Sequence, residues 1–187
     1  TAKKFQRNFF MFEITFLGTS CAVPTVQRNL SSIAVRHEGG VCLLDCGEGT
    51  QRQMMRFGVS YMKVKARLKS HLHLDHFLGA FGLIETMALN GRKEKLTIYG
   101  PVGTKATFGR TKEFVEVVEI DGKLSADFGE FSASSFKVKH SRDSFGFVFE
   151  EKERCRFHEE KAKSLGIKGP MFSKIMKEGK LKIGSKT

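Results

Sequence analysis

The chain has 187 residues, of which 40% are hydrophobic, and its formal net charge is +12 at pH 7. This hydrophobic content is enough for a core and excludes an intrinsically disordered chain, while no apolar run reaches the ~20 residues of a membrane span. The charge favours a polyanionic partner, either nucleic acid or an acidic membrane surface, with an ordinary soluble basic protein as the alternative.

The N-terminus is basic and aromatic, like the start of a secretory signal. Glu13 interrupts its apolar run, however, and no small-residue cleavage site follows, so we do not expect secretion. Met11 is a candidate start, which would make residues 1–10 additional. The four cysteines have no disulfide-framework spacing, and Cys42 and Cys46 fit small core positions, which indicates a reducing, cytoplasmic compartment.

Three strands and one helix are expected in the first 60 residues. The strands are Phe12–Leu17, Ser31–Arg36 and Val41–Asp45, and a glycine-containing hairpin turn joins the last two. Gln51–Phe57 has helical character, and Gly58 can end this helix.

The next 90 residues alternate between helical and strand patterns. An apolar stripe predicts a helix over Phe77–Leu89, and Lys95–Tyr99 reads as a strand. The segments Glu113–Ile120, Glu130–Lys139 and Ser144–Glu150 add further β character. Hairpin-connected strands with a few helices between them predict a layered α/β domain.

From Lys152 to Lys182 the composition changes. This stretch holds ten Lys or Arg and four Glu, so its net charge is +6, half of the total. We predict an extended basic arm with a short helix near Glu159–Leu165, and the alternative is an ordinary solvated surface segment.

The segment Ser70–His76 reads SHLHLDH and concentrates metal-binding side chains. Alternate residues of an extended segment face the same side, so His71 and His73 can point at one ion, while Asp75 and His76 follow as the chain turns. Imidazole and carboxylate groups are the ligands of catalytic zinc sites. Burying so many polar groups without partners would be costly, so we predict a site for two metal ions.

The blocks around this motif resemble the tRNase Z (ribonuclease Z) family. They are FLGTSCAVPTVQRNLSS, LLDCGEGTQRQ, SHLHLDHFLG, LTIYGP, and KVKHSRDSFGFVFEEK followed by EKAKSLGI and Gly-Pro, and they cover the chain from about residue 12 to 182. The resemblance implies a metallo-β-lactamase fold, an αββα sandwich. It divides the chain into a metallo-β-lactamase-type domain (1–150), a flexible tRNA-binding arm or exosite (151–182) and a tail (183–187).

The family's metal ligands carry over to His71, His73, Asp75, His76 and His140. The resemblance assigns the three residues His71, His73 and His140 to one zinc ion, and Asp75 and His76 to the second. Asp75 is also expected to accept or steer the proton of the attacking water.

Asp45 is expected beside this site, where it would orient the ligands without binding metal, and the alternative is an ordinary turn aspartate. His37 and His158 match nothing in the motif and are expected on the surface.

The resemblance implies a zinc-dependent endoribonuclease that removes the 3′ trailer from precursor tRNA and leaves a 3′-hydroxyl. Two zinc ions in one site can activate water at neutral pH and polarise the scissile phosphate. The family also implies a homodimer.

A loop that reads the tRNA acceptor end in the family has the form PxKxRN. In this chain Pro24, Arg28 and Asn29 match, whereas Val26 replaces the lysine, so one contact is in doubt. The alternative for Arg28 and Asn29 is an ordinary polar turn.

In the arm, the Gly169-Pro170 motif with Lys168 and Lys174 is expected to hold the tRNA elbow, far from the zinc ions. Lysine contacts to phosphates position a nucleic acid without reading its sequence, and such binding weakens steeply with salt.

The family pattern is incomplete in this chain. A bridging aspartate, a His-Glu pair and a last histidine ligand have no counterpart, so the sandwich is expected to be incomplete at its C-terminal side. Lys63–Lys69 also places four cations where the fold has a buried strand, and Thr104–Glu113 is shorter than the family's helical connection. We prefer a truncated or altered chain to a half-enzyme that needs a partner chain.

Two other functions remain open at this stage. The first is a tRNA-binding module or partial subunit without independent catalysis, because ligands are missing and the basic arm is intact. The second is a metallo-β-lactamase-fold phosphodiesterase for small substrates, which the basic arm disfavours because a small substrate needs no remote contact.

Overall fold

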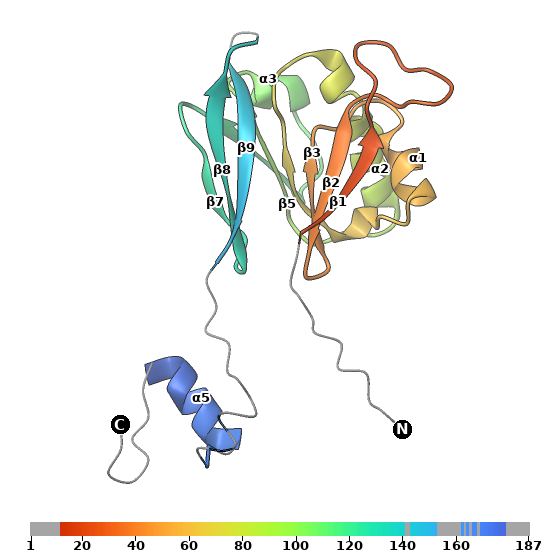
Figure 1. Cartoon of the computed structure of the whole chain (residues 1–187). Helices are drawn as coiled ribbons and strands as arrows, with labels where there is room; N and C mark the ends of the chain where they lie inside the picture. The colour runs from red at the N-terminus through yellow and green to blue at the C-terminus, as the bar shows by residue number, and fades with distance from the viewer. Residues whose placement is uncertain are drawn as a thin grey trace.

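The computed structural model describes residues 12–140, 143–152, 162, 164, 166–167 and 169–178. Two β-sheets pack face to face, and helices lie on the outer side of the larger sheet (Figure 1). Residues 1–10 and 183–187, together with Lys168 and His158, lie outside the described residues.

The larger sheet has six strands, which are, in spatial order, β1 (Glu13–Gly18), β2 (Ser32–His37), β3 (Gly40–Leu44), β4 (Val64–Leu68), β5 (Leu96–Pro101) and β6 (Val115–Ile120). The smaller sheet has three, β7 (Ser125–Asp127), β8 (Phe131–Val138) and β9 (Ser144–Glu151). The helices are α1 (Thr50–Arg56), α2 (Gly79–Leu89), α3 (Thr104–Phe108) and α5 (Gly169–Glu178), with two 3₁₀ turns, η1 (Tyr61–Lys63) and η2 (Leu74–His76).

Strand direction determines where the loops gather. The strands β1 to β3 are antiparallel, whereas β3 to β6 are parallel, so the carboxyl ends of β3 and β4 meet at one edge of the sheet. The loops that follow these strands carry Asp45 and the SHLHLDH motif. In open parallel sheets this edge is where ligands bind.

Two apolar layers hold the sandwich together. Between the helices and the larger sheet, Met54 of α1 and Leu83 and Met87 of α2 pack on buried strand residues. Between the two sheets, Leu68 of β4 packs with Phe145 of β9 and its neighbours. Alternation along each strand sends successive side chains to these opposite layers, and the result agrees with an αββα sandwich that lacks its last layer among the described residues.

The predicted strands and the helices α1 and α2 are confirmed to within two residues at each end. Sequence patterns missed β7, which is only three residues long, and α3. They also missed α5, because a Gly-Pro pair usually interrupts a helix, although proline is favoured in the first turn of one. Within the short helix expected near 159–165, Ala162 and Ser164 are helical.

Two expectations about burial are corrected. The cationic segment Lys63–Lys69 does contain a buried strand, β4, in which Lys65 is exposed at an irregularity in the pairing with β3, whereas Arg67 is 2% exposed. Lys69, directly after the strand, is 0% exposed. His37 is not a surface residue, because its ring is buried between the two sheets against aromatic neighbours. No helix in the described part of the chain is long and apolar enough to cross a membrane.

Candidate metal centre

The SHLHLDH motif begins where β4 ends and is held to the sheet edge by backbone hydrogen bonds. Lys69 N–H donates to the Tyr99 carbonyl of β5 (2.7 Å), and Cys46 N–H donates to the His76 carbonyl (2.7 Å). From the smaller sheet, Phe145 N–H donates to the Ser70 carbonyl (2.9 Å). Hydrogen bonds therefore hold the motif to the larger sheet at both of its ends and to the smaller sheet at Ser70.

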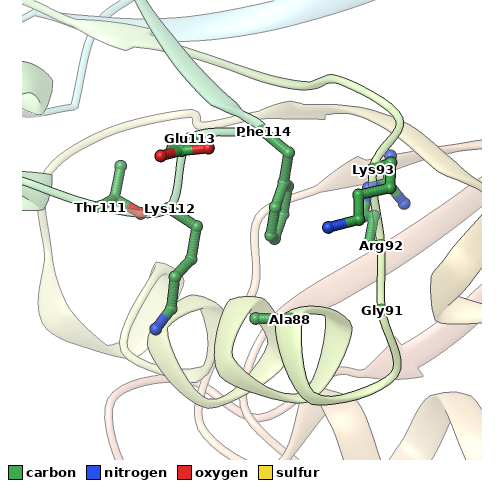
Figure 2. A pocket seen from close by; sticks show the side chains of 8 residues that line it. All are labelled: Ala88, Gly91, Arg92, Lys93, Thr111, Lys112, Glu113 and Phe114. Atoms are coloured by element: carbon green, nitrogen blue, oxygen red, sulfur yellow. The ribbon is translucent and has the colours of Figure 1, made fainter.

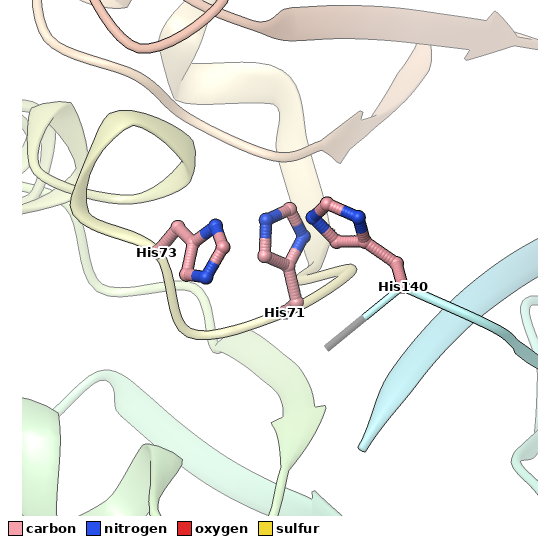
Figure 3. Close-up of side chains that lie close together, drawn as sticks. All are labelled: His71, His73 and His140. Carbon is pink, nitrogen blue, oxygen red and sulfur yellow. The ribbon is translucent and has the colours of Figure 1, made fainter. Parts of the chain in front are cut away.

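Three of the predicted ligands converge from two separate segments. Ligand atoms of His71, His73 and His140 all lie within 4.8 Å of one another, with His71 buried and the other two exposed. Figure 3 shows the His71 ring between those of His73 and His140. The ring centroids are 4.5 Å apart for His71 and His73 and 4.9 Å apart for His71 and His140. Residues 69 positions apart in the sequence, His71 and His140, thus belong to one cluster.

The hydrogen bonds of His71 leave one ring nitrogen free to bind metal. Its Nδ1 is 2.8 Å from Ser70 Oγ, which is itself 2.7 Å from Asp45 Oδ2. Because the carboxylate accepts the only hydroxyl proton, Nδ1 must be the donor to Ser70. Nε2 then carries the lone pair, and it is buried without a hydrogen-bond partner among the described residues. An unpaired buried acceptor beside two more imidazoles fits a bound divalent ion.

Burial and the neighbouring His76 lower the pKa of His71 to about 4. The ring is therefore neutral at pH 7, which is the form of histidine that binds metal.

Asp45 connects the two halves of the site. It follows β3 with a left-handed backbone (φ +57°), a strained conformation that is concentrated at functional positions. Its Oδ1 accepts the Ser70 N–H (2.8 Å), and its Oδ2 accepts the Ser70 hydroxyl and the His76 Nδ1–H (2.7 Å each). Asp45 thus lies where it was expected from the sequence. Ser70 was not expected at the site, and the signal that could have indicated it is its position between β4 and the first histidine.

Asp75 and His76 form the second candidate group. The His76 Nε2 lies 3.5 Å from Asp75 Oδ2, and the His76 ring centroid is 4.0 Å from that of His71, so the two groups adjoin. Burial opposes the charged form of His76, but the hydrogen bond and charge of Asp45 outweigh burial and raise its pKa. Burial would also raise the pKa of Asp75, but the Ala22 N–H and His76 lower it.

The loop with Pro24, Arg28 and Asn29 lies against the same edge. Ala22 N–H donates to Asp75 Oδ2 (3.0 Å), and Asn29 Nδ2 donates to the Glu48 carbonyl (2.6 Å). Pro24 and Arg28 are exposed. The loop therefore reaches the second group directly, while the Arg28 side chain is exposed to solvent.

Glycines allow the blocks around the motif to pack closely. A Cβ on Gly47 would lie 2.5 Å from the Asp75 carbonyl oxygen, and a Cβ on Gly79 would lie 2.0 Å from the Gly47 carbonyl oxygen. Only a residue without a side chain permits such an approach.

The arm residues lie elsewhere. Gly169 and Pro170 open helix α5, and Lys174 is exposed on it. Figure 1 shows α5 apart from both sheets, so these residues are not brought to the histidine cluster.

Beneath the cluster, Arg67 and Lys69 are buried in the helix layer. Lys69 Nζ lies 3.3 Å from the centre of the Phe77 ring, and the Arg67 guanidinium lies 5.3 Å from that of Phe108. Lys69 Nζ has no hydrogen-bond partner among the described residues, and burial together with Arg67 lowers its pKa to about 7.

A hollow of about 510 Å³ lies at the other end of α2, away from the histidines. Figure 2 shows Phe114 in its centre, with Lys112 on one side and Arg92 and Lys93 on the other. The Arg92 guanidinium already donates to four backbone carbonyls, and Lys112 pairs with Glu85 (2.9 Å). Arg92 and Lys112 are thus occupied by the fold, and the candidate chemistry stays at the histidine cluster.

Comparison with known proteins gives consistent results. The family model described as Anti-Pycsar protein Apyc1 matches residues 12–109, just over half of the chain. A protein named Ribonuclease Z from Methanothermobacter thermautotrophicus is 42% identical over 94% of this chain and 60% of its own length. One with the same name from Thermococcus kodakarensis is 40% identical over 91% of this chain and 57% of its own length. The chain therefore spans about three fifths of these curated relatives.

Solved structures show the same likeness. Human tRNase Z, short form, superposes with a TM-score of 0.68 at 33% identity, over 75% of this chain and 66% of that one. The metallo-β-lactamase fold protein YhfI from Bacillus subtilis superposes with a TM-score of 0.65 at 20% identity, over 73% of this chain and 56% of that one. This fold and the relatives' name imply a divalent metal ion, for which the histidine cluster provides ligands. The chain belongs to the metallo-β-lactamase-fold family that the Apyc1 model describes, and its predicted resemblance to tRNase Z is confirmed.

Proposed function

We propose that the protein is a zinc-dependent endoribonuclease that removes the 3′ trailer from precursor tRNA and leaves a 3′-hydroxyl. The observation that carries this proposal is the pair of adjoining ligand groups at the sheet edge, His71 with His73 and His140, and Asp75 with His76. They lie in a chain that is 42% identical to a protein named Ribonuclease Z. A cytoplasmic homodimer is part of the same proposal.

The residues of the chain have separate tasks in this proposal. The first group would hold one zinc ion, and the second group would contribute ligands for another. Such ions supply Lewis acidity toward a phosphodiester and toward water. Asp45, acting through Ser70 and through the His76 Nδ1–H, keeps the Nε2 atoms of His71 and His76 turned toward the site.

Asp75 is the residue that we propose to accept or steer the proton of the attacking water. The Ala22 N–H and His76 hold its pKa below the ordinary value against the effect of burial. Its carboxylate is therefore ionised at neutral pH and can receive a proton. Its contacts with the loop at 22–29 and with His76 support this role, because that loop is the segment that we propose to contact the tRNA acceptor end.

Substrate binding is proposed to use two surfaces. Pro24, Arg28 and Asn29 would contact the tRNA acceptor end beside the metal ions. The arm at 151–182, with Lys168, Gly169, Pro170 and Lys174, would hold the tRNA body as a unit separate from the domain at 1–150, with 183–187 as a tail. The net charge of +6 between residues 152 and 182 supports this role, because phosphate neutralisation dominates non-specific RNA affinity.

Metal analysis together with a cleavage assay tests this proposal. Purified protein should contain zinc and should cut a 3′-extended precursor tRNA at the trailer, and His140→Ala should lose at least about tenfold in zinc affinity. The adjacent exposed variant Lys139→Ala is the control and should retain its zinc. Equal zinc affinity in both variants would contradict the ligand assignment, and metal-loaded protein without any cleavage would contradict the enzymatic proposal.

A second candidate function is tRNA binding without independent catalysis. It is favoured by the second ligand group, which has two members among the described residues whereas the first has three. Salt-sensitive tRNA binding with no cleavage at saturating zinc would support it.

A further inference from the structure

A buried histidine ties the end of β9 that is farthest from the histidine cluster to the larger sheet. His37 is the last residue of β2, and its side chain is 2% exposed. Its Nε2 lies 2.9 Å from Oε1 of Glu151, the last residue of β9. An ionised carboxylate only accepts hydrogen bonds, so the His37 Nε2–H is the donor. The contact joins the two sheets across 114 positions of sequence.

Aromatic packing fixes the His37 ring in this place. Its centroid is 4.9 Å from the ring of Phe12 and 5.1 Å from the ring of Phe131, and Phe12 also packs edge-on against Phe149 (5.9 Å). The imidazole cannot turn away from Glu151 without leaving this cluster. The side chain of Glu151 is itself 39% exposed. The buried His37 ring therefore fixes the position of the Glu151 carboxylate, whereas the carboxylate contributes little to fixing the ring.

The next residue of the chain is anchored as well. Lys152 Nζ donates to both carboxylate oxygens of Asp127 in β7 (2.7 and 2.6 Å), and Lys152 N–H donates to the Glu130 carbonyl (3.0 Å). The basic segment 152–182 thus starts from a point that is tied to β2, β7 and the turn between β7 and β8.

The opposite end of β9 is pinned to the metal site. Phe145 N–H donates to the carbonyl of Ser70, which precedes the first histidine, and His140 lies just before the strand. An eight-residue strand rises about 3.4 Å per residue, so β9 spans about 25 Å between these two ends. The strand has the form of a rigid spacer with the histidine cluster at one end and the start of the basic segment at the other.

We propose that the His37–Glu151 contact is a positioning clasp that sets where the basic arm leaves the sandwich, and hence how far it reaches from the metal site. This inference rests on the proposed function, in which one tRNA occupies both the arm and the metal site. A substrate that binds two linked surfaces depends on their relative geometry, because the second contact forms at an effective concentration that the linkage determines. Loosening the clasp weakens tRNA binding without removing any group that touches RNA.

The first test measures the geometry of the arm without RNA. Spin labels are attached at Ser60→Cys on the body and Lys174→Cys on α5, both exposed positions, in a chain with Cys21→Ser and Cys155→Ser. The His37→Phe variant keeps the ring packing and removes the donor, and Glu151→Gln removes the charge. Both should broaden the distribution of distances between the labels. The control is Glu13→Gln, which makes the same charge change in the more exposed ion pair between Glu13 of β1 and Arg36 of β2.

The second test measures binding of a 3′-extended precursor tRNA and zinc content. We expect His37→Phe and Glu151→Gln to bind this tRNA about fivefold to tenfold more weakly, with zinc content unchanged. Glu13→Gln should bind it like the parent chain. A merely structural role would instead lower zinc content and thermal stability together with tRNA binding.

The outcomes separate the clasp from the function on which it rests. Unchanged label distributions, or a parent distribution that is already as broad as that of the variants, would overturn the clasp whether or not tRNA binds. Broader distributions with unchanged tRNA affinity would overturn the link to substrate binding. A parent chain that binds no precursor tRNA would refute the proposed function, while the label distances would still decide whether the clasp positions the arm.

Discussion

Asp45 and Lys69 are buried charged residues that lie close together under the same edge of the sheet, and they differ in their hydrogen bonds. The Asp45 carboxylate accepts three hydrogen bonds, from Ser70 and His76. Lys69, which directly precedes Ser70, has a buried ammonium group without a hydrogen-bond partner in the part of the chain that the structure describes. Burial of a charge is tolerable where hydrogen bonds replace water and costly where they do not. We therefore expect the first charge to orient the site and the second to weaken the fold that carries it.

The surroundings of Lys69 offer only partial compensation. The Phe77 ring face lies 3.3 Å from its Nζ, and a desolvated cation–π contact contributes about 2 kcal/mol. The neighbouring Arg67 guanidinium is buried as well and repels it. At the corresponding position of a parallel strand, an apolar side chain would fill the same space without this conflict.

The largest expected effect therefore comes from removing the unsatisfied charge. Lys69→Met should raise the free energy of unfolding by about 1–4 kcal/mol, because apolar replacements of buried ionic groups with similar volume are often stabilising by this amount. Urea unfolding would show a higher midpoint. The matched control is Lys65→Met, which changes an exposed lysine of the preceding strand β4 and should change stability by less than about 0.5 kcal/mol. A destabilised Lys69→Met would mean that the ammonium has a favourable partner.

The second-largest effect is expected from Asp45→Asn, which removes the charge that has hydrogen-bond partners. All three groups that face the Asp45 carboxylate are donors, so Asp45→Asn would turn an amide NH₂ toward a donor and leave one of them unpaired. We expect zinc affinity to fall about 10–100-fold, as for other residues that orient metal ligands. Zinc titration measures this, with the exposed Asp127→Asn as control. An unchanged affinity would show that Asp45 does not orient the ligands.

A smaller effect is expected at Ser70, whose hydroxyl links the Asp45 carboxylate to His71 through two hydrogen bonds. Ser70→Ala removes the acceptor of the His71 Nδ1–H and one donor to Asp45, so zinc affinity should fall by about tenfold. Ser70→Thr keeps the hydroxyl and should restore most of the affinity. If alanine and threonine behave alike, the relay through the hydroxyl is absent and Asp45 acts through His76 alone.

Local patterns were sufficient for much of this protein. The spacing of His71, His73, Asp75 and His76 predicted a metal site, and the residue patterns placed the strands other than β4 and β7 within two residues of their observed ends. The blocks around the motif pointed to tRNase Z, and the relatives named Ribonuclease Z confirm that resemblance. These features can be predicted from short stretches of sequence. Side-chain direction repeats every two residues along a strand, and the four ligands of the motif lie within one segment.

Only the tertiary structure decided which distant residues meet. His37 looked like a surface histidine, but sheet packing buries it beside Glu151. The cations of Lys63–Lys69 seemed incompatible with a core strand, yet parallel pairing with β3 and β5 makes this segment central and buries Arg67 and Lys69. Pairing between strands far apart in the sequence determines burial, and no local pattern records it. The sequence by itself therefore predicted the candidate metal ligands and indicated the family, whereas the packing of the two sheets brought His140 to the other histidines and created the contact at the start of the basic arm.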